Sequence, residues 1–338
     1  MQRAVCAQAK KQSFHGYMPE CGADFLRQAI CAHYAARGIV LTPEEIFISH
    51  GASDDLGAIT DLFAPDPLAL IPQPAYPAYV DVNLMAGHRI ATMPCSAANG
   101  FLPLPDPKQH ADLIYLCAPN NPTGTVMRRE ALAKWIHYAK EQHALIIFDA
   151  AYEAFIQEQD VPHSIFEVPD SQSCAIEICS LSKTAGFTGI RCGYTIVPRS
   201  LAYNGISLHD MWVRDSTTKT NGVSYITQCA AAAVFSAEGQ QQIRANIEVY
   251  RQNAHILGQA LSARGLSYSG GINAPYLWMQ CPAGMCSWEC FHYLLHNAQI
   301  IGTPGVGFGT CGDNYFRLSA FGDPEQTKLA AQRIQRLF

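Results

Sequence analysis

The chain has 338 residues, of which 49% are hydrophobic and 15% charged, so it is long enough for one large core and a smaller second lobe. Its formal net charge of -5 argues against nucleic acid or an anionic membrane surface as the main partner. No apolar run approaches the roughly 18–20 residues that span a bilayer, and residues 1–12 lack the apolar stretch of a secretory signal.

Between about residues 44 and 200, short apolar runs alternate with helical patterns. The runs are rich in isoleucine and leucine and contain few polar residues, as expected of strands buried on both faces. They lie at residues 46–48, 68–71, 113–117, 145–148, 176–179 and 194–197. Between two of them, Leu132, Trp135, Ile136 and Ala139 mark one face of a helix. This alternation predicts an α/β fold with a mostly parallel sheet covered by helices.

The pattern changes after about residue 230. A long helical pattern carries apolar residues at positions 243, 247, 250, 254, 257 and 261, and Gly265 ends it. Strand-like segments follow at residues 276–279 and 315–319. A last helix opens with Asp323 as its N-cap and Pro324 at the first helical position. These elements predict a smaller α+β domain at the C-terminus.

We therefore expect three parts, with no internal repeat among them. They are an N-terminal segment (residues 1–22), a large α/β domain (residues 23–230) and a small α+β domain (residues 231–338). The cleft between the two domains is the expected ligand site, because ligands gather where domains meet.

The chain contains 13 cysteines, which is an odd number, and they are scattered over the sequence. Several lie in apolar segments, where a free thiol behaves as a small hydrophobic side chain. Cys281, Cys286 and Cys290 form the closest cluster, but zinc sites usually show tighter ligand pairs, so we expect no metal site. This usage of cysteine favours a reducing compartment, the cytoplasm.

Polar residues follow several of the predicted strands, where an open α/β sheet gathers its ligands. They are the turn at residues 51–54, the segment 120–124, Asp149 with Tyr152, the segment Ser180 to Lys183, and Arg191. A turn of small residues before a helix can bind an anion through free N–H groups, helped by the helix dipole. Each of these segments or residues, taken alone, could equally be an ordinary turn, a helix cap or a surface charge. Their order and spacing together favour a shared site.

In that order and spacing, the chain resembles the fold-type I aminotransferases. The matching motifs are Asn121-Pro-Thr-Gly, Asp149-x-x-Tyr152, Ser180-x-x-Lys183 and Arg191. Residues 182–191, together with residues 16–20, 218–222 and 273–276, resemble more narrowly the LL-diaminopimelate aminotransferases. The resemblance runs from about residue 1 to the C-terminus. It implies the fold of a fold-type I transferase that depends on pyridoxal 5'-phosphate.

The resemblance implies roles for individual residues. Lys183 would hold the cofactor and move protons, Asp149 would keep the cofactor's ring nitrogen protonated, and Tyr76 would stack on the ring. The complete set of expected cofactor-binding residues is Tyr17, Ala52, Ser53, Tyr76, Asn121, Asp149, Tyr152, Ser180, Leu181, Ser182, Lys183, Arg191 and Asn221. The expected substrate-binding residues are Glu20, Ser53, Tyr76, Asn121, Asn221 and Arg317, and Arg317 would grip the α-carboxylate.

The family also implies a homodimer with shared active sites, in which Tyr17 reaches the phosphate of the neighbouring subunit's site. The expected substrates are an amino acid and a 2-oxo acid. The reaction implied is amino transfer from LL-diaminopimelate to 2-oxoglutarate, which gives tetrahydrodipicolinate and L-glutamate in lysine biosynthesis.

Two departures from the family leave the substrate open. The family carries several dozen residues ahead of the part matched here, with a tyrosine and a glycine that contact substrate, so we expect a more open cleft and weaker substrate binding. Ser53 stands where the diaminopimelate enzymes usually have a substrate-binding lysine. The alternatives are an aminotransferase for glutamate, aspartate or an aromatic amino acid, or a weakly active paralogue that works through dimer contacts.

Overall fold

The computed structural model describes residues 2, 3, 6, 16–64 and 66–337, and its centre is a seven-stranded sheet with the order β1-β7-β6-β5-β4-β2-β3. The strands from β3 to β6 pair in parallel, whereas β7 pairs antiparallel with both β6 and β1. The expected, mostly parallel sheet is therefore confirmed. The strands are β1 (Ile46–Ser49), β2 (Leu68–Gln73), β3 (Arg89–Pro94), β4 (Leu113–Cys117), β5 (Leu145–Asp149), β6 (Ala175–Ser180) and β7 (Gly193–Ile196).

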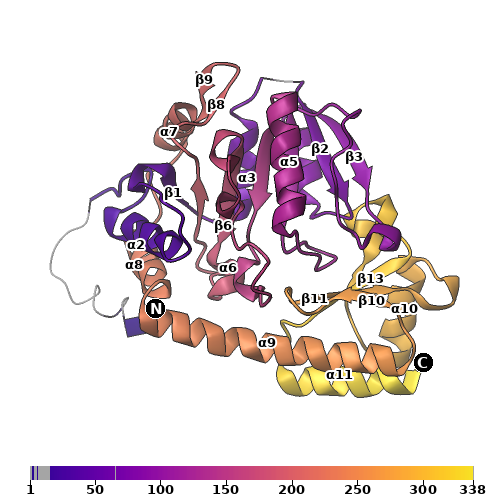
Figure 1. Ribbon diagram of the computed structural model, residues 1–338. Coiled ribbons are helices and arrows are strands. Elements are labelled where there is room, and N and C mark those ends of the chain that lie inside the picture. Colours follow the sequence, from indigo (N-terminus) through magenta and orange to yellow (C-terminus); the bar gives the residue numbers. More distant parts are fainter. Residues whose placement is uncertain (1, 4–5, 7–15, 65, 338) are drawn as a thin grey trace.

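Helices cover this sheet, as Figure 1 shows for α5 across its front. The expected apolar face of α5 is confirmed, since Leu132, Trp135, Ile136 and Ala139 are all buried. The helices of the large domain are α2 (Asp24–Ala35), α3 (Ala52–Thr60), α4 (Ala78–Met85), α5 (Arg129–Gln142), α6 (Leu181–Thr184), α7 (Leu208–Lys219) and α8 (Tyr225–Val234). A short hairpin of β8 (Ala202–Tyr203) and β9 (Ile206–Ser207) precedes α7.

A second, four-stranded antiparallel sheet forms the small domain, with the order β10-β11-β13-β12. The last helix begins as expected, because the Asp323 carboxylate accepts the N–H groups of Glu325 and Gln326, each at 3.0 Å. The elements are α9 (Ala237–Ala263), β10 (Tyr268–Gly270), β11 (Tyr276–Gln280), α10 (Ser287–Ala298), β12 (Thr303–Pro304), β13 (Tyr315–Ser319) and α11 (Pro324–Leu337).

Helix α9 joins the two domains. It runs beneath both of them, with α11 packed alongside its C-terminal half (Figure 1). Ile243 and Ile247 belong to the core of the large domain, whereas Leu257 and Leu261 belong to that of the small domain. One 27-residue helix therefore contributes to two cores, and the expected boundary at residue 231 falls within α8, the helix that precedes it.

The chain direction of the sheet determines where polar side chains can meet. Strands β1, β2, β4, β5 and β6 all run in the same direction, so their C-terminal ends share one edge. In Figure 1 this edge faces α9 and the small domain. Side chains that follow these strands therefore lie opposite those of β11 and β13.

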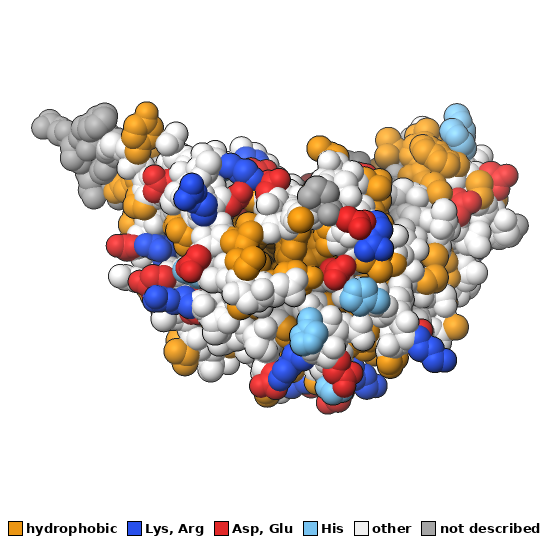
Figure 2. All heavy atoms as spheres, turned by 90° about the horizontal axis from the view of Figure 1, so that it is seen from above, with side chains coloured by type: hydrophobic (Ala, Val, Ile, Leu, Met, Phe, Trp, Pro, Cys, Tyr) orange, Lys and Arg blue, Asp and Glu red, His pale blue; other side chains and the backbone are white. Residues whose placement is uncertain are grey.

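On the face seen in Figure 2, acidic and basic side chains are interspersed, and many of them lie next to one another. Within the described ranges, no helix has both the length and the apolar character needed to cross a membrane. The 13 cysteines are all free thiols. The same ranges hold no group of three or more His, Cys, Asp or Glu side chains placed to hold a metal ion.

Candidate active site

A cavity of about 360 Å³ lies at the C-terminal ends of the strands of the large sheet, and Tyr276 and Arg317 of the small domain line its far side. Eleven of the residues singled out by sequence line it. They are Ala52, Ser53, Tyr76, Asn121, Asp149, Tyr152, Ser180, Ser182, Lys183, Arg191 and Arg317. Tyr79, Cys117, Ala151, Thr188 and Tyr276 complete the lining. Residues nearly 270 positions apart in the sequence thus meet in one site.

Lys183 projects from the short helix α6, directly after β6. The Ser180 hydroxyl caps that helix by accepting the N–H of Ser182 at 3.2 Å. Lys183 is half-buried, and its Nζ lies 5.5 Å from the centre of the Phe321 ring. Burial lowers the pKa of the Lys183 amine, and the guanidinium groups of Arg317 and Arg191 lower it further. More of the amine is therefore neutral near pH 7, as a nucleophile requires.

Asp149 ends β5 and presents a buried carboxylate to the cavity. Its Oδ2 accepts the Tyr79 hydroxyl at 2.6 Å, and its Oδ1 accepts the Ala151 N–H at 2.9 Å. Burial raises the pKa of Asp149, and these two hydrogen bonds oppose that shift. In the described residues no lysine, arginine or histidine forms an ion pair with this carboxylate. Because buried charges are normally paired, the site fits a ligand with a cationic ring nitrogen.

Arg191 and the first turn of α3 form the anion-binding end of the cavity. Arg191 Nη1 donates to the Ser182 hydroxyl and to the Thr188 carbonyl, both at 3.2 Å. A Cβ atom on Gly51 would lie 2.7 Å from Arg191 Nη2, so the guanidinium lies directly against the turn. The N–H groups of Ala52 and Ser53 are in the first turn of α3, where no intrahelical acceptor exists. These donors fit a phosphate dianion.

Gly193 on β7 lies against the same turn. A Cβ atom there would lie 2.7 Å from the Cys179 carbonyl oxygen and 2.9 Å from Gly51 Cα. Because both are backbone atoms, we expect Gly193→Ala to destabilise the fold by about 1–3 kcal/mol. Thermal denaturation should give a lower Tm for this variant. The matched control Gly189→Ala, whose Cβ would meet open space, should melt like the wild type. An unchanged Tm for Gly193→Ala would contradict this close backbone approach.

Arg317 on β13 forms the opposite wall. Its guanidinium lies between two aromatic rings, 4.4 Å from the centre of Tyr276 and 4.8 Å from that of Phe308. Arg317 Nη1 donates to Asn121 Oδ1 at 2.6 Å, and Nη2 donates to the Thr303 hydroxyl at 3.2 Å. Its Nε is buried without a partner in the part of the chain that is described. The guanidinium is thus held in place with donor capacity left, which fits a ligand carboxylate.

Tyr152 and Tyr276 join the two domains within the cavity. Their hydroxyls are 2.8 Å apart. Burial raises the pKa of Tyr152 well above its ordinary value, so it stays a hydrogen-bond donor. Sequence reasoning did not assign Tyr276 or Tyr79 to the site. Tyr79 had a signal, because it follows Tyr76 by three residues at the start of a helix, where such a pair shares one face.

Four residues singled out by sequence do not line this cavity. Leu181 is buried and lines a different cavity of about 240 Å³, on the other side of β6. Tyr17 is 89% exposed, and Glu20 and Asn221 also lie outside the lining. A Cβ atom on Gly222 would lie 2.7 Å from the Pro19 carbonyl, so the segments 16–20 and 220–222 lie together. The roles suggested for these residues stay predictions.

Comparison with known proteins covers almost the whole chain. The family model described as "Aminotransferase class I and II" matches residues 1–334. LL-diaminopimelate aminotransferase of Bacteroides thetaiotaomicron is 47% identical over 354 residues, covering 99% of this chain and 86% of the relative. The enzyme of the same name from Agathobacter rectalis is 46% identical over 350 residues, covering 100% and 86%. The solved structure of L,L-diaminopimelate aminotransferase from Chlamydomonas reinhardtii superimposes with a TM-score of 0.92 at 36% identity, covering 99% and 85%.

Proposed function

The chain belongs to the class I and II aminotransferases, and we propose that its amino donor within this family is LL-diaminopimelate. The amino group would pass to 2-oxoglutarate, so that the products are tetrahydrodipicolinate and L-glutamate, in lysine biosynthesis. The family depends on pyridoxal 5'-phosphate. One observation carries the proposal. Lys183, Asp149 and Arg317 line one cavity in a chain whose relatives are named LL-diaminopimelate aminotransferase.

The residues of the cavity fit pyridoxal 5'-phosphate. When bound, the cofactor supplies an aldehyde carbon and a ring that withdraws electrons from the substrate α-carbon. Lys183 would hold the aldehyde end, and Asp149 would accept the proton of the ring nitrogen. Asn121 and Tyr152 would bind the phenolic oxygen. Ser180, Ser182, Arg191 and the first turn of α3 would hold the phosphate.

The chain's own groups account for substrate positioning and proton transfer. The Arg317 guanidinium, held by Asn121 and by two aromatic rings, binds the α-carboxylate and so places the α-carbon beside Lys183. The Lys183 amine, whose pKa is lowered by burial, would act as the base that takes a proton from that carbon and as the acid that returns one. Tyr76 lines the cavity wall, where its ring would stack on the cofactor ring.

Specificity for the distal end of the substrate depends on Ser53. Ser53 is exposed at the first turn of α3 and lines the cavity. It offers a short neutral donor where the diaminopimelate enzymes usually have a lysine. This observation favours the second candidate function, an aminotransferase for another amino acid.

Ser53→Lys should separate these two functions. A charged hydrogen bond contributes about 1.5–3 kcal/mol, so the KM for LL-diaminopimelate should fall by roughly tenfold or more. The KM for glutamate, a shorter donor used in the reverse reaction, should change little. Ser53→Met, with similar length and no charge, is the matched control and should lower neither KM. Steady-state kinetics with both donors would measure this ratio, and an equal effect on both would place the distal carboxylate elsewhere.

A panel of amino donors tests the proposed substrate directly. Purified protein with pyridoxal 5'-phosphate would be given 2-oxoglutarate and one donor at a time, and L-glutamate would be measured. LL-diaminopimelate should give the highest kcat/KM. Turnover of aspartate or an aromatic amino acid in preference to it would overturn the substrate. Turnover of no donor would favour the weakly active paralogue.

We also propose a cytoplasmic homodimer with shared active sites. The exposed Tyr17 and the joined segments 16–20 and 220–222 support the shared sites, since they form a surface outside the chain's own cavity. The free thiols support a reducing compartment. A monomeric mass for the active protein in light scattering would contradict the dimer.

A further inference from the structure

Tyr79 is the side chain in closest contact with the Asp149 carboxylate. The 2.6 Å distance from its hydroxyl to Asp149 Oδ2 is in the range of a hydrogen bond to an ionised acceptor. Both residues are buried, with 2% of Tyr79 and 6% of Asp149 exposed. The contact joins α4 to the end of β5, and both residues line the active-site cavity.

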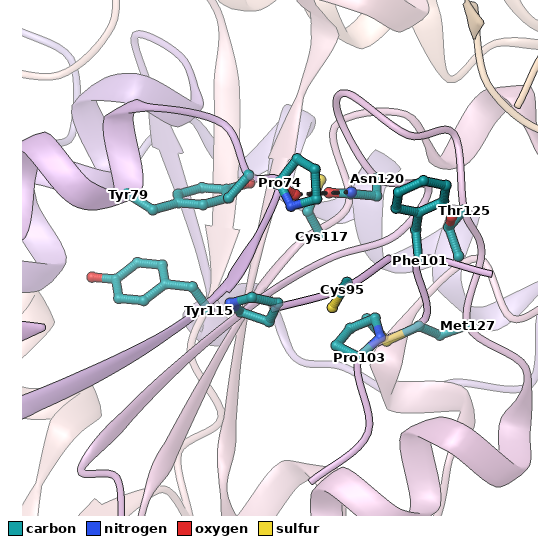
Figure 3. A pocket seen from close by; sticks show the side chains of 12 residues that line it. Pro74, Tyr79, Cys95, Phe101, Pro103, Tyr115, Cys117, Asn120, Thr125 and Met127 are labelled. Atoms are coloured by element: carbon teal, nitrogen blue, oxygen red, sulfur yellow. Dashed lines mark hydrogen bonds between the residues drawn. The ribbon is translucent and has the colours of Figure 1, made fainter. Parts of the chain in front are cut away.

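Contacts hold both the ring and the backbone of Tyr79. It stacks on Tyr115 with 5.4 Å between ring centres and 29° between planes, and it meets the edge of Tyr76 at 5.6 Å. The fully buried Asn83 amide donates to the Tyr79 carbonyl at 2.7 Å. In Figure 3, Tyr79 and Tyr115 lie one above the other with their hydroxyls pointing in opposite directions. The Tyr79 hydroxyl is the one bonded to Asp149, and Tyr115 does not line the active-site cavity.

Tyr79 lines the active-site cavity and also a small pocket behind it. Behind the active site, Tyr79, Tyr115 and Cys117 line the small pocket of Figure 3, which has a volume of about 20 Å³. Such a volume holds about one water molecule. Removal of the hydroxyl would take one donor away from Asp149 Oδ2, which is a buried acceptor.

We propose that Tyr79 is a positioning residue for the cofactor, which orients the Asp149 carboxylate toward the ring nitrogen and keeps it ionised. The proposal rests on the proposed function, because it presumes pyridoxal 5'-phosphate in the cavity. Burial favours the neutral acid, whereas a hydrogen bond to the charged form favours the carboxylate. With the Tyr79 hydroxyl in place, the shared proton stays on the ring nitrogen, and the ring remains the stronger electron acceptor.

Cofactor affinity of Tyr79→Phe tests this role without reference to turnover. Apoprotein would be titrated with pyridoxal 5'-phosphate and with its 1-deaza analogue, in which C–H replaces the ring nitrogen. The variant should bind pyridoxal 5'-phosphate about tenfold more weakly than the wild type and bind the analogue almost unchanged. Tyr115→Phe keeps the same ring stack and removes a hydroxyl that does not hydrogen-bond the Asp149 carboxylate, whose partners in the described residues are Tyr79 and the Ala151 N–H. It should change neither affinity.

A second comparison keeps the test decisive if Tyr79→Phe is less stable. Adding Tyr79→Phe to Asp149→Asn should cause no further loss of affinity for pyridoxal 5'-phosphate, because the carboxylate on which the hydroxyl acts is absent. An equal loss for both ligands, a further loss in the double variant, or no loss at all would overturn the role of Tyr79. Failure of the wild type to bind either ligand would overturn the proposed function as well. That outcome differs from the three above, in which the wild type binds pyridoxal 5'-phosphate.

Discussion

Lys183→Ala is expected to lose amino transfer by a factor of at least about 10⁴, because one change removes both the nucleophile and the proton carrier. Lys183 is the one lysine among the residues that line the described cavity. Its neighbours Arg317 and Arg191 cannot replace it, since a guanidinium stays protonated and does not act as a nucleophile or base at neutral pH.

The measurement is glutamate formation from LL-diaminopimelate by the variant and by two comparison proteins. Lys183→Arg keeps the positive charge and should be as inactive as Lys183→Ala, which would separate chemistry from charge. Lys140→Ala removes an exposed lysine on α5 that pairs with Asp170, and it should keep wild-type activity. Activity of Lys183→Ala within tenfold of the wild type would show that another group holds the cofactor.

Asp149→Ala is expected to keep the cofactor bound while turnover falls by roughly 10²–10³-fold, the usual scale for loss of one preorganised electrostatic group. The phosphate end of the cavity, at Arg191 and the first turn of α3, is untouched by this change and should still hold the cofactor. A ring nitrogen that lacks its carboxylate loses its proton, and the ring becomes a poorer electron acceptor.

Single-turnover absorbance changes with LL-diaminopimelate would measure this loss apart from product release. Asp149→Asn has almost the same shape without the charge, so it should be nearly as slow as Asp149→Ala. Asp170→Ala removes an exposed carboxylate and should have no effect. A near wild-type rate for Asp149→Ala would exclude the role given to this residue.

Strands could be predicted best from the sequence where all of their residues are buried. Strands β4, β5 and β6 are buried along their whole length, and their apolar runs predicted them closely. Strand β3 was missed because it lies at the edge of the sheet, where exposed residues such as Arg89 interrupt the pattern. The short strands β10 and β12 carry too few residues to show a periodicity.

The candidate site could be predicted in part for a similar reason. Parallel strands bring their C-terminal ends together, so the shared location of Asp149 and Lys183 followed from their places directly after predicted parallel strands. The contact between Tyr79 and Asp149 did not follow, since it depends on how α4 packs against the sheet. The division of α9 between two cores was also hidden, because a helix shows the same period whichever core it contacts.

The proposed active site is tested most directly by identifying the lysine that holds the cofactor. Purified protein would be incubated with pyridoxal 5'-phosphate and reduced with borohydride, which fixes the cofactor covalently to the lysine that holds it. Mass spectrometry of the tryptic peptides would then identify that lysine. We expect the pyridoxyl group on Lys183, which lies on α6 directly after β6 and lines the same cavity as Asp149 and Arg317. A pyridoxyl group on any other lysine, or on none, would contradict it.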